Sequence, residues 1–255
     1  MDIQDHVILV SGGASGLGEA TCRLFAQRGA SGIGIIDRDV QRGQRVAGEL
    51  GERALFAPAD ITRAEEVDAA VAAIAKRFGA IHTVVNCAAI GLPARLIGRK
   101  GPIPMEKFDQ VMKVNLYGTV HVLRAAVPVM MENTPNSDGE RGVIINVASG
   151  AAYEASIGQV AYAASKAAVV GLTIPLAREL AEVGIRVLTI APGGFDTPIY
   201  DSAPPTLKES LAAQMIFPKR MGRAPEFARF AAEIVENAMH NGRAYRFDAG
   251  MTLPA

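Results

Sequence analysis

A glycine-rich turn near the start of the chain constrains the fold more than any other feature. It reads Ser-Gly-Gly-Ala-Ser-Gly-Leu-Gly over residues 11–18, between a β-branched stretch at 6–10 and a helix-like stretch at 19–28. In a strand–turn–helix unit, Gly12, Gly16 and Gly18 would allow a tight turn, close approach to a pyrophosphate and close helix packing. The amides at the helix N-terminus would hold the negative charge. The context predicts a dinucleotide site, whereas an isolated glycine run would be only a flexible loop.

Short apolar runs follow this unit at residues 33–37, 54–59, 83–89 and 143–147, with a last one at 244–248. Helix-like stretches separate them, and such alternation predicts parallel strands with right-handed crossovers. The length of 255 residues and the hydrophobic content of 49% suit one large core. We therefore predict an α/β fold: a single doubly wound Rossmann domain over residues 1–255, with a central parallel sheet of about seven strands.

An acidic residue ends the second predicted strand. Asp37 lies 19 residues after Gly18, where a carboxylate can accept hydrogen bonds from the ribose hydroxyls and repel a 2′-phosphate. This favours NAD over NADP. The neighbouring Arg38, Arg42 and Arg45 leave NADP open, because an arginine can turn towards a phosphate.

Two further strand ends carry candidate cofactor contacts. Asp60 follows the third strand beside Ile61, and its carboxylate would meet the adenine edge or cap the helix that begins near Arg63. The fourth strand ends in the small residues Cys87 and Ala88. Small side chains are what a cofactor lying across the strand tips requires.

Three residues around the strand at 143–147 predict proton-transfer chemistry. Ser149 would emerge at the carboxyl end of that strand, the ligand-bearing edge of open α/β sheets. Tyr162 and Lys166 are four apart in a helix-like segment, so both would lie on one face. An ammonium close to the phenol would lower the tyrosine pKa from its usual value of about 10. Taken alone, the pair is also compatible with an ordinary amphipathic helix.

Composition excludes several classes of function. Lys plus Arg and Asp plus Glu each number 26, so no net field attracts nucleic acid or an anionic membrane. The polar N-terminal residues are unlike a leader, and no apolar run approaches the ~20 residues of a membrane span. Cys22 and Cys87 fit reduced buried thiols, and the four histidines form no cluster for a metal. We expect a cytoplasmic protein with no metal, nucleic-acid or membrane partner.

The ordered motifs resemble the short-chain dehydrogenase/reductase family over essentially the whole chain. They comprise the glycine turn at 11–18, Asn-Cys-Ala-Ala at 86–89, Asn115, Ser149, Tyr162 with Lys166, and Pro-Gly-Gly-Phe-Asp-Thr at 192–197. The resemblance implies Ser149, Tyr162, Lys166 and Asn115 as catalytic residues, with Ser149 and Tyr162 also binding substrate, and a homotetramer. The implied NAD-binding set is Gly12, Ser15, Gly16, Leu17, Gly18, Asp37, Asp60, Ile61, Cys87, Ala88, Tyr162, Lys166, Phe195 and Thr197.

For Asn115 the resemblance implies a water-mediated proton relay through Lys166, whereas a polar side chain inside a helix often makes only local hydrogen bonds. Ala89 stands where the family has glycine, and a positive φ there would disfavour it. Either its backbone is ordinary or the site is slightly reshaped.

Two polar insertions, at 91–104 and 132–142, resemble those of the type II 3-hydroxyacyl-CoA dehydrogenases, also described as 17β-hydroxysteroid dehydrogenases. The resemblance implies interconversion of 3-hydroxyacyl-CoA and 3-oxoacyl-CoA. The basic residues Arg95, Arg99 and Lys100 would meet the phosphates of coenzyme A, or form only a solvated loop.

Residues 198–221 mix apolar residues and prolines and predict a lid over an apolar substrate. We also expect Gly171 and Pro175 to interrupt the helix after Lys166 and the uncharged tail to pack against a neighbouring subunit. Two alternatives stay open: an NADPH-dependent 3-oxoacyl carrier-protein or other ketone reductase, and a non-enzymatic NAD-binding scaffold.

Overall fold

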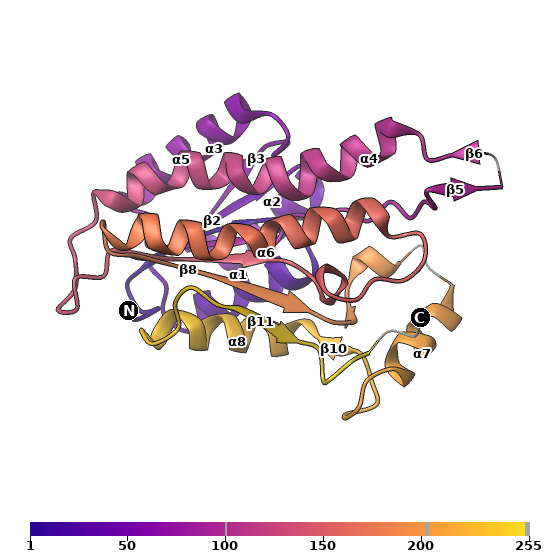
Figure 1. Ribbon diagram of the computed structural model, residues 1–255. Coiled ribbons are helices and arrows are strands. Elements are labelled where there is room, and N and C mark those ends of the chain that lie inside the picture. The colour runs from indigo at the N-terminus through magenta and orange to yellow at the C-terminus, as the bar shows by residue number, and fades with distance from the viewer. Residues whose placement is uncertain (100, 202–203, 253–255) are drawn as a thin grey trace.

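The computed structural model describes residues 1–99, 101–201 and 204–252, and its core is a seven-stranded sheet (Figure 1). The strand order is β11-β8-β7-β4-β1-β2-β3, and every neighbouring pair is parallel. The strands are β1 (Val7–Ser11), β2 (Gly32–Asp37), β3 (Ala54–Pro58), β4 (Thr83–Asn86), β7 (Gly142–Val147), β8 (Ile185–Pro192) and β11 (Ala244–Phe247). The predicted doubly wound fold is confirmed, with strand ends within a few residues of their expected positions.

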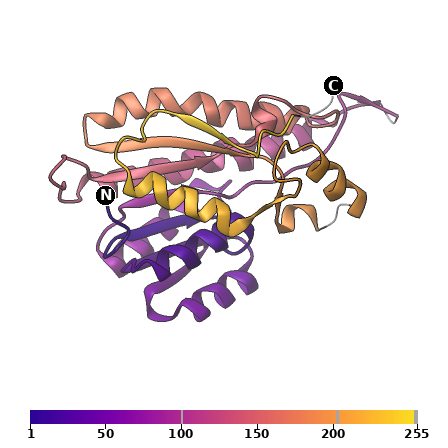
Figure 2. The ribbon, with the colours of Figure 1, turned by 90° about the horizontal axis from the view of Figure 1, so that it is seen from below.

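Helices cover both faces of this sheet, as two views at right angles show (Figures 1 and 2). One face packs against α1 (Gly16–Gln27), α2 (Val40–Leu50) and α8 (Ala224–Glu236). The other packs against α3 (Ala64–Phe78), α5 (Gly118–Met131) and α6 (Val160–Ala181). Each face has its own apolar cluster, which explains why all residues of β1 and β7 are buried and read as continuous apolar runs.

The strand order reverses beside β1, which pairs with β2 on one side and β4 on the other. Such a reversal opens a crevice at the carboxyl ends of the strands. The glycine turn, Asp37, Cys87 and Ser149 all follow strand ends, so the topology brings them to this one edge of the sheet.

The first insertion forms a hairpin of β5 (Ile97–Gly98) and β6 (Gly101–Pro102) that projects from the body of the molecule (Figure 1). It is followed by α4 (Met105–Met112) and by a π-helical segment (Lys113–Tyr117) that runs directly into α5. The second insertion folds back onto the sheet, where the Asn133 amide donates to the carbonyls of Ile81 and Arg141.

Shorter elements complete the carboxyl edge. They are 3₁₀ turns at Gly150–Ala152 (η3) and Pro198–Tyr200 (η4), the pair β9 (Phe195–Asp196) and β10 (Gly222–Arg223), and α7 (Pro205–Ala213). A further 3₁₀ turn, Gly51–Arg53, precedes β3 at the opposite, amino edge. The predicted lid at 198–221 thus contains η4 and α7, with residues 202–203 outside the described part. The end of the predicted tail, residues 253–255, also lies outside it.

Helix α6 corrects two expectations. It runs unbroken from Val160 to Ala181, so Gly171 and Pro175 do not interrupt it. Packing of Val169, Thr173 and Ala177 against the sheet outweighs the donor lost at Pro175. By length and composition α6 could also cross a membrane, contrary to the expectation that no run is long enough. In the structure it lies over the sheet beside β8, as a core helix does (Figure 1).

Candidate active site

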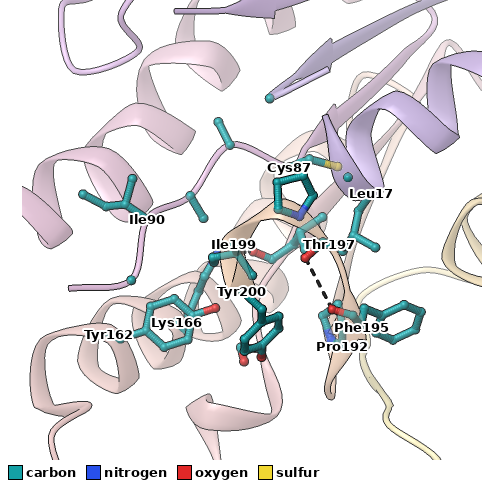
Figure 3. A pocket seen from close by; sticks show the side chains of 18 of the residues that line it. Leu17, Cys87, Ile90, Tyr162, Lys166, Pro192, Phe195, Thr197, Ile199 and Tyr200 are labelled. Atoms are coloured by element: carbon teal, nitrogen blue, oxygen red, sulfur yellow. Dashed lines mark hydrogen bonds between the residues drawn. The ribbon is translucent and has the colours of Figure 1, made fainter. Parts of the chain in front are cut away.

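A cavity of about 870 Å³ lies at the carboxyl edge of the sheet. Figure 3 shows side chains from the glycine turn, the β4 end, α6 and the β8 end turned towards it. Of the residues expected from sequence, all but Asn115 line this cavity: Gly12, Ser15, Gly16, Leu17, Gly18, Asp37, Asp60, Ile61, Cys87, Ala88, Ser149, Tyr162, Lys166, Phe195 and Thr197.

The glycine turn is held too tightly for side chains at two of its positions. Gly12 has φ +71°, and a Cβ there would lie 2.6 Å from the Ala88 amide nitrogen. A Cβ on Gly18 would lie 2.1 Å from the Gly12 carbonyl oxygen. Ser15 precedes α1 without a side-chain capping bond. The first-turn amides of α1 therefore remain available to an anion such as a pyrophosphate.

Asp37 is fixed at the tip of β2. Its carboxylate oxygens accept hydrogen bonds from the amides of Ala14 (3.1 Å) and Asp39 (3.0 Å). Arg38 and Arg42 also line the cavity, and the Arg42 Nε lies 3.5 Å from the Asp39 carboxylate. Arg45 is committed to Glu19 and Glu49 away from the cavity. Two carboxylates, of Asp37 and Asp39, and two guanidinium groups thus share the region of the β2 tip.

The residues beyond β3 and β4 resolve two alternatives. Asp60 accepts from the Thr62 amide at 2.9 Å, while Arg63 is the residue that precedes α3, so Asp60 does not cap that helix. Ala89 is not among the residues with positive φ in the described ranges, so its backbone is ordinary. Burial raises the pKa of Cys87 to about 12, which keeps this cavity-lining thiol neutral.

The pKa of Tyr162 is shifted in the direction opposite to the one expected from its spacing to Lys166. Burial raises the pKa of Tyr162 to about 12, and a hydrogen bond with the Ser149 hydroxyl acts in the opposite direction without cancelling it. The expected lowering by Lys166 is wrong for this structure, because the cost of burying a phenolate dominates. Tyr162 is therefore a neutral phenol with a proton to give.

Lys166 is almost fully enclosed, with 2% of its surface exposed. Its Nζ donates to the Val147 carbonyl oxygen at 2.7 Å and lies 5.8 Å from the centroid of the Tyr162 ring. Burial lowers the pKa of Lys166 to about 8. The ammonium is anchored to the strand that leads to Ser149, and one helical turn separates it from Tyr162.

Asn115 lies inside the π-helical segment, and its side chain bonds to residues that are distant in the sequence. Its amide oxygen accepts from the Ile90 amide (2.8 Å), and its amide nitrogen donates to the Ile90 carbonyl and the Ser165 hydroxyl (both 3.0 Å). These bonds tie the segment after β4 to α6. Neither expected role is thus seen directly: the side chain makes tertiary hydrogen bonds in place of bonds within its own helix, and the relay stays a prediction. The π-helical turn that carries it is a feature frequent at functional sites.

The cavity also contains polar residues that sequence reasoning missed. Arg246 of β11 donates to Glu154 (2.9 Å), Asp248 (2.7 Å) and the Met251 carbonyl (2.8 Å), and it closes one side of the cavity. Tyr200, considered only as an apolar lid residue, lines the cavity too. The one available signal for Arg246 was a charged residue between Tyr245 and Phe247 in a short strand.

Two hydroxyls and a buried ammonium beside a dinucleotide-type turn can move a proton while a cofactor moves a hydride, which is the chemistry of dehydrogenases. Comparison of the sequence with known protein families agrees, since residues 6–208 match the short chain dehydrogenase family. The chain belongs to the short-chain dehydrogenase/reductase family, whose members use NAD(P).

Three relatives illustrate the similarity. The chain is 43% identical to the Homo sapiens 3-hydroxyacyl-CoA dehydrogenase type-2, over 98% of this chain and 97% of the relative. The Mycobacterium avium 3-hydroxyacyl-CoA dehydrogenase type-2 structure superimposes with a TM-score of 0.91 at 40% identity, covering 98% and 97% of the two chains. The structure of a Brucella melitensis 3-ketoacyl-(acyl-carrier-protein) reductase complexed with NADH superimposes with a TM-score of 0.86 at 32% identity, covering 98% of this chain and 99% of the reductase chain.

Proposed function

We propose that this enzyme interconverts 3-hydroxyacyl-CoA and 3-oxoacyl-CoA with NAD. The observation that carries the proposal is the convergence of Ser149, Tyr162 and Lys166 on a cavity that also contains Asp37. Similarity to type-2 3-hydroxyacyl-CoA dehydrogenases along nearly the whole chain supports the substrate class.

The proposed mechanism places the reacting oxygen between two hydroxyls. Ser149 donates a hydrogen bond to this oxygen and orients it, and Tyr162 exchanges a proton with it. A bound nicotinamide supplies or accepts the hydride at the adjacent carbon. With its raised pKa, Tyr162 holds its proton at neutral pH and is ready to protonate a ketone oxygen during reduction. In the alcohol-oxidising direction it must first lose that proton, a step that the hydrogen bond from Ser149 favours.

The carboxylate at the end of β2 supports the choice of NAD over NADP. Hydrogen bonds from two backbone amides hold the Asp37 carboxylate beside the cavity. There it would accept hydrogen bonds from ribose hydroxyls and repel a 2′-phosphate. Arg42 is drawn towards Asp39, which leaves Arg38 as the guanidinium that would favour NADPH. The NADPH-dependent reductase is therefore the second candidate.

The acyl-CoA assignment is supported by the hairpin. Ala94 at its base bonds through its amide to the Gly158 carbonyl (2.8 Å), which fixes the hairpin beside the substrate side of the cavity. Arg95 and Arg99 are exposed and line a second recess of about 580 Å³ on the hairpin. Phosphates of coenzyme A leaving the main cavity would meet these cations. Lys100, the third predicted cation, lies outside the described residues.

A cofactor and substrate matrix tests the proposal. Absorbance of the reduced nicotinamide is followed while acetoacetyl-CoA is offered with NADH, then with NADPH, and a CoA-free β-keto ester is offered in parallel. Faster oxidation of NADH that depends on the CoA moiety is expected. Turnover only with NADPH would refute the Asp37 argument, and equal turnover of the ester would refute the acyl-CoA assignment.

A further inference from the structure

Tyr200 occupies a fixed position close to the proposed cofactor loop. It ends η4, where its amide donates to the Thr197 carbonyl at 3.0 Å. Thr197 in turn packs against the glycine turn, since a Cβ on Gly16 would lie 3.3 Å from the Thr197 Cβ. The backbone that carries Tyr200 is thus braced against the turn that would hold the pyrophosphate.

The phenol of Tyr200 is turned into the cavity next to Tyr162 (Figure 3). Burial raises the pKa of Tyr200, and its ionisation would also raise the pKa of Tyr162, so the two phenols interact electrostatically. The side chain is half-buried, and within residues 1–99, 101–201 and 204–252 its hydroxyl has no hydrogen-bond partner. A partly buried donor in this state gains stability when a ligand supplies an acceptor.

The charged groups near Tyr200 are engaged to different degrees. Arg246 spends its donors on Glu154, Asp248 and the Met251 carbonyl, whereas Lys166 uses one of its three donors on the Val147 carbonyl. Tyr200 differs from Arg246 in offering an uncommitted donor beside the proposed proton-transfer pair, and from Lys166 in offering a neutral one.

We propose that the Tyr200 hydroxyl donates a hydrogen bond to a second substrate oxygen, the thioester carbonyl of a 3-oxoacyl or 3-hydroxyacyl thioester. This inference rests on the proposed function. In such a substrate one methylene separates the thioester carbonyl from the reacting carbon. Once Ser149 and Tyr162 hold the reacting oxygen, the second oxygen stays within a few bonds of it, and Tyr200 is the neighbouring cavity residue with an uncommitted hydroxyl to meet it. Tyr200 would thus select β-oxygenated thioesters over simple alcohols and ketones.

The test compares two substrates that differ at one carbon. Acetoacetyl-CoA carries the thioester carbonyl, whereas S-(3-oxobutyl)-CoA, the thioether formed from CoA and methyl vinyl ketone, has a methylene there. Both keep the reacting ketone and the CoA moiety. The Tyr200→Phe variant removes only a hydroxyl. Tyr153→Phe is the matched control, because Tyr153 is exposed and does not line the cavity.

We expect Tyr200→Phe to reduce kcat/KM for acetoacetyl-CoA about threefold to tenfold more than for the thioether, the effect of one net hydrogen bond. Tyr153→Phe should leave the ratio of the two substrates at the wild-type value. Thermal melting and NADH binding verify that Tyr200→Phe is folded. NADH binding is followed by the fluorescence of the nicotinamide, and the chain contains no tryptophan whose emission would add to the signal.

Equal effects on the two substrates, or no effect on either, would overturn the role of Tyr200 while leaving the proposed function intact. A wild-type enzyme that turns over the thioether but not acetoacetyl-CoA would overturn the proposed function and this inference together. The two failures therefore appear in different measurements, one in the variant and the other in the wild type.

Discussion

The two ends of the sheet both bury a cation, yet they treat it in opposite ways. At the carboxyl edge, Lys166 makes one hydrogen bond, to Val147, out of the three that an ammonium can donate. At the amino edge, Arg186 is 7% exposed and donates to Glu140 and to the carbonyls of Ile234, Val235 and His240. The first cation keeps donors for a ligand, and the second spends its donors on the fold.

This difference shows how burial alone fails to distinguish a functional charge from a structural one. Arg186 lies at the amino end of β8, whereas Lys166 lies on α6 and reaches the carboxyl end of β7, and both are shielded from water. Arg186 is compensated by a carboxylate and several carbonyls, as buried charges generally require. Lys166 is compensated only in part, and burial lowers its pKa to about 8. Incomplete compensation is the sign of a site that expects a ligand.

The largest expected effect is at the carboxyl edge. Tyr162→Phe removes the proton-exchanging hydroxyl and should lower turnover by about 10²–10⁴-fold, the usual contribution of general acid–base catalysis. Nicotinamide fluorescence should report unchanged NADH binding, because the phenyl ring still fills the same space. Substantial remaining turnover would exclude Tyr162 from proton transfer.

The amino edge should respond with stability rather than activity. Arg186→Met removes one of the two cations that pair with the buried Glu140, leaving only the Met1 ammonium, and frees the carbonyls that Arg186 bonds. It should reduce the free energy of unfolding by about 3–5 kcal/mol. The measurement is urea denaturation, compared with Arg124→Met, an exposed arginine paired with Asp68 whose loss should cost about 1 kcal/mol or less. Equal losses of unfolding free energy in the two variants would show that the buried Arg186–Glu140 pair contributes no more stability than an exposed ion pair.

Histidines at the amino edge should make stability sensitive to acid. His82 stacks on His6 with ring centroids 4.3 Å apart, and its Nδ1 accepts from the Val7 amide. Burial lowers the pKa of His82 to about 4, from 6.5. As the pH falls from 6.5 to 4, the unfolded chain gains a proton that the folded chain does not, so stability decreases in this window.

Because His82 is partly exposed, we expect this loss to be about 1–2 kcal/mol after solvent screening. His82→Asn keeps a hydrogen-bond acceptor near the Val7 amide without titrating and should flatten the pH dependence of unfolding. A variant that retains the full wild-type slope between pH 4 and 6.5 would assign the acid sensitivity to other groups.

The smallest effect concerns the hairpin that extends the carboxyl edge. Reversing charge in Arg95→Glu/Arg99→Glu should raise KM for acetoacetyl-CoA about threefold to tenfold, since both cations are exposed and screened. KM for a truncated acetoacetyl thioester should not change. Arg178→Glu/Arg229→Glu, two exposed changes on α6 and α8, controls for the same change in net charge. Equal effects on the two thioesters would reduce the hairpin to a solvated loop.

Features of the site that depend on neighbouring residues in the sequence could be predicted, whereas features that depend on distant residues could not. The glycine turn, Asp37 and Ser149 follow directly from strand-end patterns, because each motif and its structural context are adjacent in the chain. The continuity of α6 through Pro175 was not predictable, since packing on the sheet outweighs a local helix-breaking signal. The raised pKa of Tyr162 depends on its burial, which the spacing from Lys166 does not report.

Residues brought to the cavity by long-range pairing were the hardest to identify. Arg246 arrives through the pairing of β11 with β8, and Tyr200 through the packing of Thr197 on the glycine turn. Neither belongs to a motif with its neighbours in sequence. Asn115 shows the converse, because its motif was visible while its contacts with Ile90 and Ser165 were not.

The Arg246 contacts have a consequence for the order in which the enzyme matures. Arg246 reaches back to Glu154 and forward to the Met251 carbonyl, so one side of the cavity is built from residues that are synthesised after β1 to β8. Domains tend to fold as units as they are synthesised. A nascent chain with β1 to β8 in place still has an open cavity wall. Synthesis must pass β11 before a competent cavity exists, and this delays substrate capture until β11 has been made.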